Sequence, residues 1–214
     1  MRTRTVAAIA GVGAAAITAV VLVASDRSDP PAPPAKAASA DIPARRVPST
    51  QPAGVRVDCS RRSGADFPDA FESSRNLVVG PLVLEGGAES QRPSVIREFG
   101  GQKFALLVTA GHTVTVRLPQ AERGFAGLAF GGLGKRPLPD GEIQLRDTAR
   151  TMTFVACRRG EPSGSHADGK AVTFWSGAVV MRAPACVALE IYVDDEPDAH
   201  HAMLDMGGRR RCRV

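Results

Sequence analysis

Short apolar runs separated by turn residues are the feature that most limits what this chain can fold into. From Asn76 onward, runs of four to eight apolar or alternating residues are interrupted by Gly, Pro and Asp. No window of 12 residues in this region has good helical periodicity. Many short strands without intervening helices favour packed antiparallel sheets. We therefore predict an all-β domain, an antiparallel β-sandwich of Ig-like or jelly-roll-like type.

The positions of these turn residues also predict where the strands lie. We expect about nine, over residues 77–84, 104–108, 113–118, 125–130, 142–145, 151–157, 171–175, 178–181 and 187–193. Gly80-Pro81 predicts a bulge or kink in an edge strand, because proline donates no ladder hydrogen bond. The alternation in 113–118 predicts that Val114, Val116 and Leu118 share one face. Residues 66–74 are interpreted as one short helix, and 199–206 as either helix or strand.

The N-terminal segment indicates the compartment. Arg2 and Arg4 precede an uncharged run of 19 residues, Val6–Ala24. A helix of that length spans about 28 Å, close to the hydrocarbon core of a bilayer. We predict a signal anchor within residues 1–24 that crosses the cell membrane once through residues 6–24 and leaves the C-terminal domain outside the cytoplasm. Cleavage at Val23-Ala24-Ser25 is the alternative, and it would give a secreted protein.

The segment between anchor and domain is rich in proline and alanine. Residues 25–54 contain Pro30-Pro-Ala-Pro-Pro34 and three further prolines, with no aromatic residue. Such a composition cannot bury enough apolar surface to offset the entropy of ordering. We predict a disordered, semi-rigid linker that holds the domain, residues 55–214, away from the membrane.

The charge distribution argues against nucleic acid as a partner. The chain carries a net charge of +5, but from Val55 onward 21 Lys and Arg residues face 19 Asp and Glu residues. Most of the excess positive charge therefore belongs to the leader and the linker. A basic footprint on the domain, which nucleic-acid binding requires, is not indicated.

All four cysteines lie in the predicted domain. An even number of cysteines outside the cytoplasm predicts two disulfides, and four cysteines allow three pairings. We favour Cys157–Cys186 with Cys59–Cys212, because Cys157 and Cys186 flank one strand excursion and the two ends of a domain are often close together. A zinc site is disfavoured, since no C-x-x-C spacing is present.

The stretch Thr153-Phe-Val-Ala-Cys157 ends in a cysteine. It is loosely similar to the T-L-x-T-C pattern that ends in the nucleophile of the sortase transpeptidases, which also have an anchor, a linker and a small β-barrel. The resemblance implies His112 as the upstream partner of Cys157 and Arg182 as the oxyanion-stabilising cation. Ala156 and Phe154 depart from the pattern, and a disulfide would remove the nucleophile.

Other candidate sites are weaker. Asp194, Asp195, Glu196 and Asp198 follow a strand and could supply carboxylate oxygens to Ca²⁺, although acidic loops are usually only solvated. Gly131-Gly-Leu-Gly-Lys135 lacks the spacing of a phosphate-binding P-loop and is interpreted as a turn. We expect no cofactor.

The layout of leader, linker and domain resembles uncharacterised exported or membrane-anchored proteins of high-GC Gram-positive bacteria. The stretches that carry this resemblance are Asp58-Cys-Ser-Arg-Arg-Ser-Gly-Ala-Asp-Phe-Pro68 and Thr151-Met-Thr-Phe-Val-Ala-Cys157. The group has no assigned activity. The sequence thus predicts a membrane-tethered, non-catalytic module that binds an envelope protein or polymer. The alternative is an envelope enzyme, either a sortase-like transpeptidase or a hydrolase.

Overall fold

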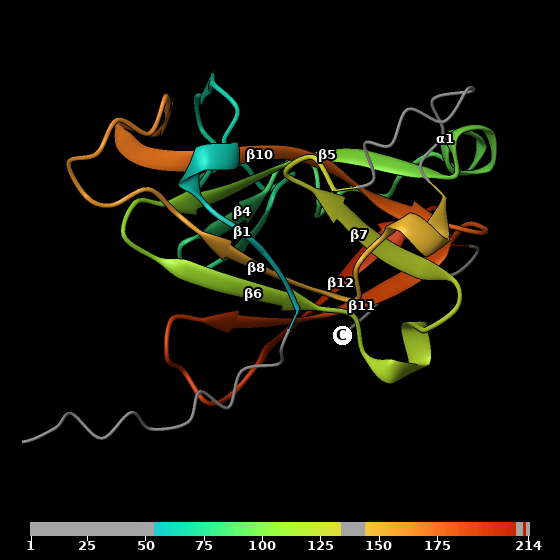
Figure 1. Ribbon diagram of the computed structural model, residues 1–214. Coiled ribbons are helices and arrows are strands. Elements are labelled where there is room, and N and C mark those ends of the chain that lie inside the picture. Colours follow the sequence, from blue (N-terminus) through green and yellow to red (C-terminus); the bar gives the residue numbers. More distant parts are fainter. Residues whose placement is uncertain (1–53, 134–143, 209–211, 213–214) are drawn as a thin grey trace, which may run out of the picture. The chain divides into compact units, whose positions relative to one another are not determined.

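Two β-sheets dominate the computed structural model, which describes residues 54–133, 144–208 and 212 (Figure 1). The strands are β1 (Val55–Val57), β2 (Ala65–Phe67), β3 (Leu77–Val79), β4 (Leu82–Leu84), β5 (Gly101–Thr109), β6 (Thr113–Arg117), β7 (Ala126–Phe130), β8 (Thr151–Val155), β9 (Ser165–Ala167), β10 (Lys170–Met181), β11 (Ala185–Val193) and β12 (His200–Met206). The helical elements are α1 (Pro93–Phe99) and three 3₁₀ turns, η1 (Cys59–Arg61), η2 (Gln120–Glu122) and η3 (Leu145–Asp147). The prediction of a β-rich fold is confirmed.

The strand order brings together segments that are far apart in the chain. The smaller sheet has the order β1-β8-β6-β11-β12. The larger one has the order β2-β9-β10-β5-β4-β3, and β7 also pairs with β10. β10 pairs with β5 along one edge, and with β9 and then β7 along the other. Its 12 residues therefore hold the larger sheet together.

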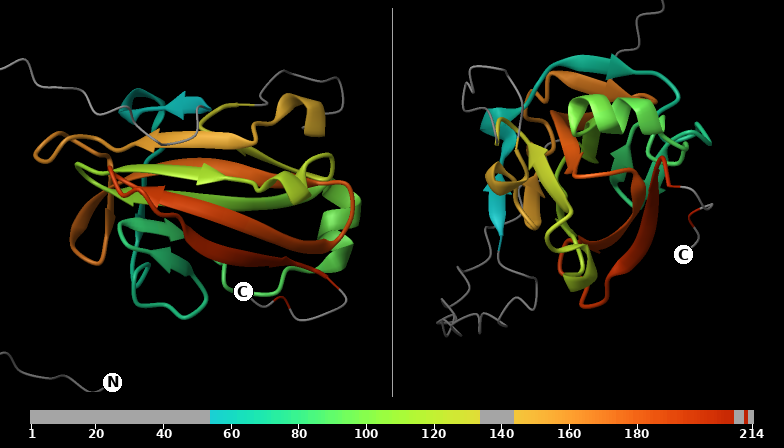
Figure 2. Two further views of the ribbon diagram at one scale, coloured as in Figure 1. Left: turned by 90° about the horizontal axis from the view of Figure 1, so that it is seen from below. Right: turned by 90° about the vertical axis from the view of Figure 1, so that its right-hand side faces the viewer.

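The main core is formed by side chains from both sheets, whose arrangement is seen in two further views of the ribbon (Figure 2). Val114, Val116 and Leu118 all belong to this core, so the predicted alternation of β6 is confirmed. Trp175 on β10 is fully buried and packs against Phe154 of β8, with 5.4 Å between ring centroids. A second cluster, centred on Phe67, Val83, Leu107 and Val172, covers the other face of the larger sheet.

The prediction of purely antiparallel sheets is wrong at two strand pairs. β1 is parallel to β8, with Val57 opposite Phe154, and β2 is parallel to β9. Both N-terminal strands pair with strands about 100 residues later in the chain, so no hairpin fixes their direction. A parallel pair needs only a long connection, which this separation supplies.

The helix predicted over 66–74 is also wrong. β2 occupies 65–67, and a turn follows in which Asp69 adopts a φ of 61°. The one described α-helix is α1, whose seven residues are too few for a recognisable apolar period. α1 ends at Gly100, which adopts the left-handed conformation with a φ of 67°. The ambiguous segment 199–206 contains β12.

Three strand predictions need correction. The kinked strand over 77–84 is a hairpin, β3–β4, which turns at Gly80 with a φ of 52°; β3 does lie at the sheet edge. The two strands predicted at 171–175 and 178–181 are the single strand β10, because Gly177 continues the ladder opposite Phe130. Of the strand predicted over 142–145, residues 142 and 143 lie outside the described residues, and Leu145 begins η3.

The favoured disulfide pairing, Cys157–Cys186 with Cys59–Cys212, is wrong. The structure joins Cys59 to Cys157 and Cys186 to Cys212. Because β1 and β8 are parallel and in register, both strands deliver their following cysteines to the same end of the sheet. β11 and β12 are antiparallel, with Cys186 opposite Asp205, so the chain after β12 returns Cys212 to Cys186. The two disulfides indicate an oxidising, extracytoplasmic environment.

The predicted anchor at residues 6–24 and nearly all of the linker lie outside the described residues. Within the ranges that are described, no helix combines the length and the apolarity needed to cross a membrane.

Candidate functional site

The disulfide removes the candidate nucleophile. Cys157 is fully buried and its sulfur is bonded to Cys59. Its backbone N–H donates to Thr173 Oγ1 at 2.7 Å, and its carbonyl accepts from Gly111 N at 2.8 Å. Thiolate catalysis needs a free, partly exposed sulfur. The hypothesis that Cys157 acts as a nucleophile is therefore wrong in this fold.

His112 and Arg182 do not form a site with Cys157 either. The His112 carbonyl accepts from Ala156 N at 3.0 Å, so its backbone lies beside Cys157. Its imidazole, however, pairs through Nδ1 with Asp194 Oδ2 at 2.7 Å. Arg182 follows the far end of β10, nine residues beyond Thr173, which is roughly 30 Å along a strand. The three predicted residues are not brought together.

In the acidic loop after β11, Asp194 holds the turn that precedes β6 in place. Asp194 has a φ of 47°, and its two oxygens accept from Thr113 N and His112 Nδ1. Partial burial raises the pKa of Asp194, but these two hydrogen bonds and the charge of His112 outweigh it, so the pKa is lowered. Glu196 pairs separately with His200 Nε2 at 2.8 Å.

The other predicted ligands in this loop, Asp195 and Asp198, are exposed. Across the described parts of the chain, no three His, Cys, Asp or Glu side chains are grouped as a metal site would require. The calcium hypothesis therefore gains no support from the arrangement of these carboxylates.

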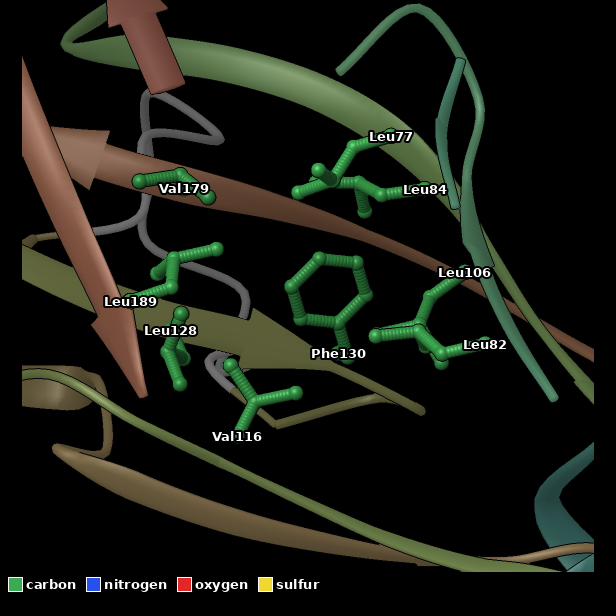
Figure 3. Close-up of a pocket in the computed structure, with 9 residues that line it drawn as sticks. All are labelled: Leu77, Leu82, Leu84, Leu106, Val116, Leu128, Phe130, Val179 and Leu189. Atoms are coloured by element: carbon green, nitrogen blue, oxygen red, sulfur yellow. The ribbon is translucent and has the colours of Figure 1, made fainter. Parts of the chain in front are cut away.

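A small apolar void lies in the core, where nine side chains from both sheets surround it (Figure 3). Its lining contains only Leu, Val and Phe side chains: Leu77, Leu82, Leu84, Leu106, Val116, Leu128, Phe130, Val179 and Leu189. Its volume is about 10 Å³. A space of that size holds at most one water molecule, and its apolar lining offers that water no hydrogen bond. The void is a packing defect, and it is too small for a ligand.

An open groove of about 280 Å³ lies beside the Cys59–Cys157 disulfide. Two arginines, two serines and two glycines line it: Arg61, Arg62, Ser63, Gly131, Gly132 and Ser176. We call it the arginine groove. Its lining contains no carboxylate, so two guanidinium charges face hydroxyl and backbone groups. This combination of side chains is suited to an anion.

The turn that carries the two arginines is fixed to the core. Asp58 caps η1, and its carboxylate accepts from Ser60 N at 3.0 Å. The hydroxyl and the N–H of Ser60 both donate to Asp58 and hold its pKa below the usual range. The Asp58 carbonyl accepts from the indole N–H of the buried Trp175 at 3.1 Å. Together with the disulfide at Cys59, these bonds present Arg61 and Arg62 on a rigid turn.

The opposite wall of the groove is the turn after β7. Gly131 N donates to the Ser176 carbonyl at 3.2 Å, which fixes this turn on β10. Gly131 has a φ of 58°, and a Cβ at this position would lie 2.3 Å from Val57. Gly132 also has a positive φ, 87°. Glycine is therefore required where the wall approaches β1 most closely.

The Cys59–Cys157 disulfide also brings a second arginine pair to this end of the domain. Arg158 and Arg159 follow Cys157 directly, and both are exposed, as are Arg61 and Arg62. Glu161 lies at this end too, and it accepts from Arg158 N at 3.0 Å. The acidic loop after β11 also reaches this end, because Asp194 bonds His112 and Thr113, whose strand pairs with the end of β8. The two arginine pairs thus lie at an end of the domain that carries both signs of charge, whereas the lining of the arginine groove itself holds only positive charge.

A second, larger groove of about 400 Å³ carries mixed charges. Asp69, Arg75, Glu85 and Lys103 are among its lining residues. Arg75 is bound to Glu89 through two hydrogen bonds, of 2.7 and 3.1 Å. Two carboxylates and two cations thus line the second groove, so its lining has no excess of either charge. The arginine groove is therefore the better candidate for selective binding.

Sequence reasoning missed the arginine groove, although its parts were visible. The stretches Cys59-Ser-Arg-Arg62 and Cys157-Arg-Arg159 each join a cysteine to an arginine pair. The pairing Cys59–Cys157 would have placed them together, but another pairing was favoured. The comparisons add no functional information: no protein-family model, no curated protein and no solved structure matches the chain.

Proposed function

We propose that this chain is an exported, membrane-tethered module that binds a component of the cell envelope without catalysing a reaction on it. The observation that carries the proposal is the Cys59–Cys157 disulfide. It occupies the sulfur of the candidate nucleophile, and it fixes the turn that presents the arginine groove. Cys157, which would be the nucleophile in an enzyme of the sortase type, here holds the arginine groove in place through its disulfide.

The proposed setting combines sequence and structure. The disulfides indicate an oxidising compartment, and the apolar run at 6–24 supplies the proposed anchor. The proline-rich residues 25–54 would act as the spacer. We propose further that the two packed sheets form a β-sandwich of Ig-like or jelly-roll-like type, a proposal supported by the shared core between them.

The full-length chain in non-ionic detergent provides the first test. We expect it to sediment with isolated cell-wall material and to saturate as its concentration rises. A folded chain that sediments with no envelope fraction would refute the proposal.

The enzyme alternative is tested by a thiol-reactive substrate analogue under non-reducing conditions. We expect no labelling, because all four cysteines are paired. Labelling that disappears in Cys157→Ala, while Cys186→Ala keeps it, would establish the enzyme and overturn the binding proposal.

A further inference from the structure

The donors of the arginine groove identify the chemical class of its ligand. Each guanidinium has five N–H groups in a planar fork that matches two oxygens of a phosphate. Arg61 Nη1 donates to the Gly131 carbonyl at 3.4 Å, and Arg62 Nη1 donates to the Cys59 carbonyl at 3.0 Å. These bonds orient the side chains but leave most of their N–H groups without an acceptor among the described residues. The groove therefore offers several charged donors to an incoming anion.

Backbone and hydroxyl groups complete the set. Gly131 N and Leu133 N donate within the turn, whereas Gly132 N, between them, has no acceptor among the described residues. A backbone N–H in a turn of positive φ is a common contact for phosphate oxygens. The hydroxyls of Ser63 and Ser176 lie in the same lining. A phosphate, with several oxygens pointing in different directions, uses such a set more fully than a carboxylate does.

The surroundings of the groove favour a chain of phosphates over a single one. The groove is open and does not enclose its contents. The Cys59–Cys157 disulfide brings the exposed Arg158 and Arg159 to the same end of the domain, so two further guanidinium groups, beside the carboxylate of Glu161, are available to a second phosphate of the same molecule. η1 lies at the far end of β1 from Gly54, where the described chain begins (Figure 1).

We propose that the arginine groove binds the phosphate groups of a phosphodiester-linked polymer of the cell envelope. The inference deepens the proposed function and rests on it. Arg61 and Arg62 supply the paired N–H forks, and the glycine turn supplies a backbone donor. The binding is electrostatic and selective for phosphate, and no covalent step is involved.

The test measures affinity of the full-length chain in non-ionic detergent for immobilised poly(glycerol phosphate). Arg61→Gln/Arg62→Gln removes both groove charges. Arg97→Gln/Arg123→Gln removes two exposed charges outside the groove, one on α1 and one after η2. We expect the groove variant to bind at least about tenfold more weakly for each guanidinium lost. The control variant should stay within about threefold of the wild type, since exposed distant charges are screened by salt.

Two further probes test the selectivity. Arg61→Lys/Arg62→Lys keeps the charge but removes the planar forks, so we expect an intermediate affinity. Poly(glutamate), a carboxylate polymer of similar charge density, should bind more weakly than poly(glycerol phosphate). Equal losses in the groove and control variants, or equal affinity for the two polymers, would overturn the inference.

The remaining arms separate the possible sources of phosphate. If phosphatidylglycerol vesicles bind as tightly as the polymer and the groove variant abolishes this binding, the ligand is a lipid headgroup and the polymer assignment fails. If the wild type binds wall material stripped of phosphate polymers with unchanged affinity, this inference fails while the proposed function stands. Melting midpoints and non-reducing gels of all variants verify that the fold and both disulfides are intact.

Discussion

Removal of each disulfide in turn tests both the connectivity and the arrangement of the domain. Cys59 and Cys157 are separated by 98 residues, and Cys186 and Cys212 by 26. In the chain-entropy model the longer loop stabilises the folded state by about 4.7 kcal/mol and the shorter by about 3.5 kcal/mol. We therefore expect Cys59→Ala/Cys157→Ala to be the more destabilising double variant.

Burial adds to this difference. Cys157 is fully buried and belongs to the packed interior, whereas Cys186 and Cys212 are half-buried. Truncation of a buried side chain leaves a cavity that the surroundings fill only in part. In a domain of this size, 1 kcal/mol corresponds to a shift of about 2–4 °C in Tm. The entropy term alone thus predicts a fall of roughly 9–19 °C for the first pair and roughly 7–14 °C for the second.

The assay combines thermal unfolding by circular dichroism with titration of free thiols in the denatured, non-reduced protein. With the observed pairing, Cys59→Ala/Cys157→Ala contains no free thiol, because the other disulfide is intact. Cys157→Ala/Cys186→Ala removes one partner from each disulfide and should expose two free thiols. Two thiols in the first variant and none in the second would refute the connectivity. A larger loss of Tm on removal of the C-terminal disulfide would refute the stability argument.

Three further substitutions test local features of the fold. The lowered pKa of Asp194 stabilises the folded state above its unfolded pKa, near 3.8, and this contribution is lost as the pH falls through the lower folded value. Asp194→Asn should therefore cost stability at pH 7, by at most about 1 kcal/mol because the side chain is 43% exposed, and much less near pH 2; an equal cost at both pH values in urea titrations would contradict this. Glu122 is buried, and Oε1 accepts from Ala188 N at 3.1 Å while Oε2 has no partner within the described parts of the chain. Glu122→Gln can keep the bonded oxygen and should be neutral or stabilising, whereas Glu122→Ala should cost about 1–3 kcal/mol in the same titration; the reverse ranking would show that the hydrogen bond to Ala188 N does not stabilise the fold. A Cβ at Gly177 would lie 2.2 Å from the ring of Phe130, so Gly177→Ala should lower Tm measurably, and an unchanged Tm would show that β7 can move away from β10.

The sequence predicts best those strands in which apolar and polar residues alternate along the strand itself. β6 was found almost to the residue because Thr113–Arg117 alternates with period two, and that period is fixed by strand geometry. Sequence predicts two strands in place of β10 because a glycine inside a strand weakens it and often marks a bulge or bend. Only the partner strand reveals why Gly177 is tolerated: Phe130 lies directly opposite and fills its place.

The candidate site shows the same division. The residue types at Arg61, Arg62 and Gly131 were visible in the sequence, but their proximity was not. It depends on β1 joining β8 in parallel, a contact between segments about 100 residues apart. No local period encodes which edge of a sheet a distant strand will join, or in which direction it will run.

By itself, the sequence determined the β-rich class of the fold, the strands with a clear local pattern such as β6, and the presence of disulfides, because each of these follows from local pattern or from composition. The tertiary structure decided the pairing of the disulfides, the loss of the candidate nucleophile and the assembly of the arginine groove. The Cys59–Cys157 bond, the loss of the nucleophile and the groove depend on the pairing of β1 with β8, and the Cys186–Cys212 bond depends on the pairing of β11 with β12. The first pairing is supported by contacts such as Trp175 with Asp58, which form only when the sheets close on their common core.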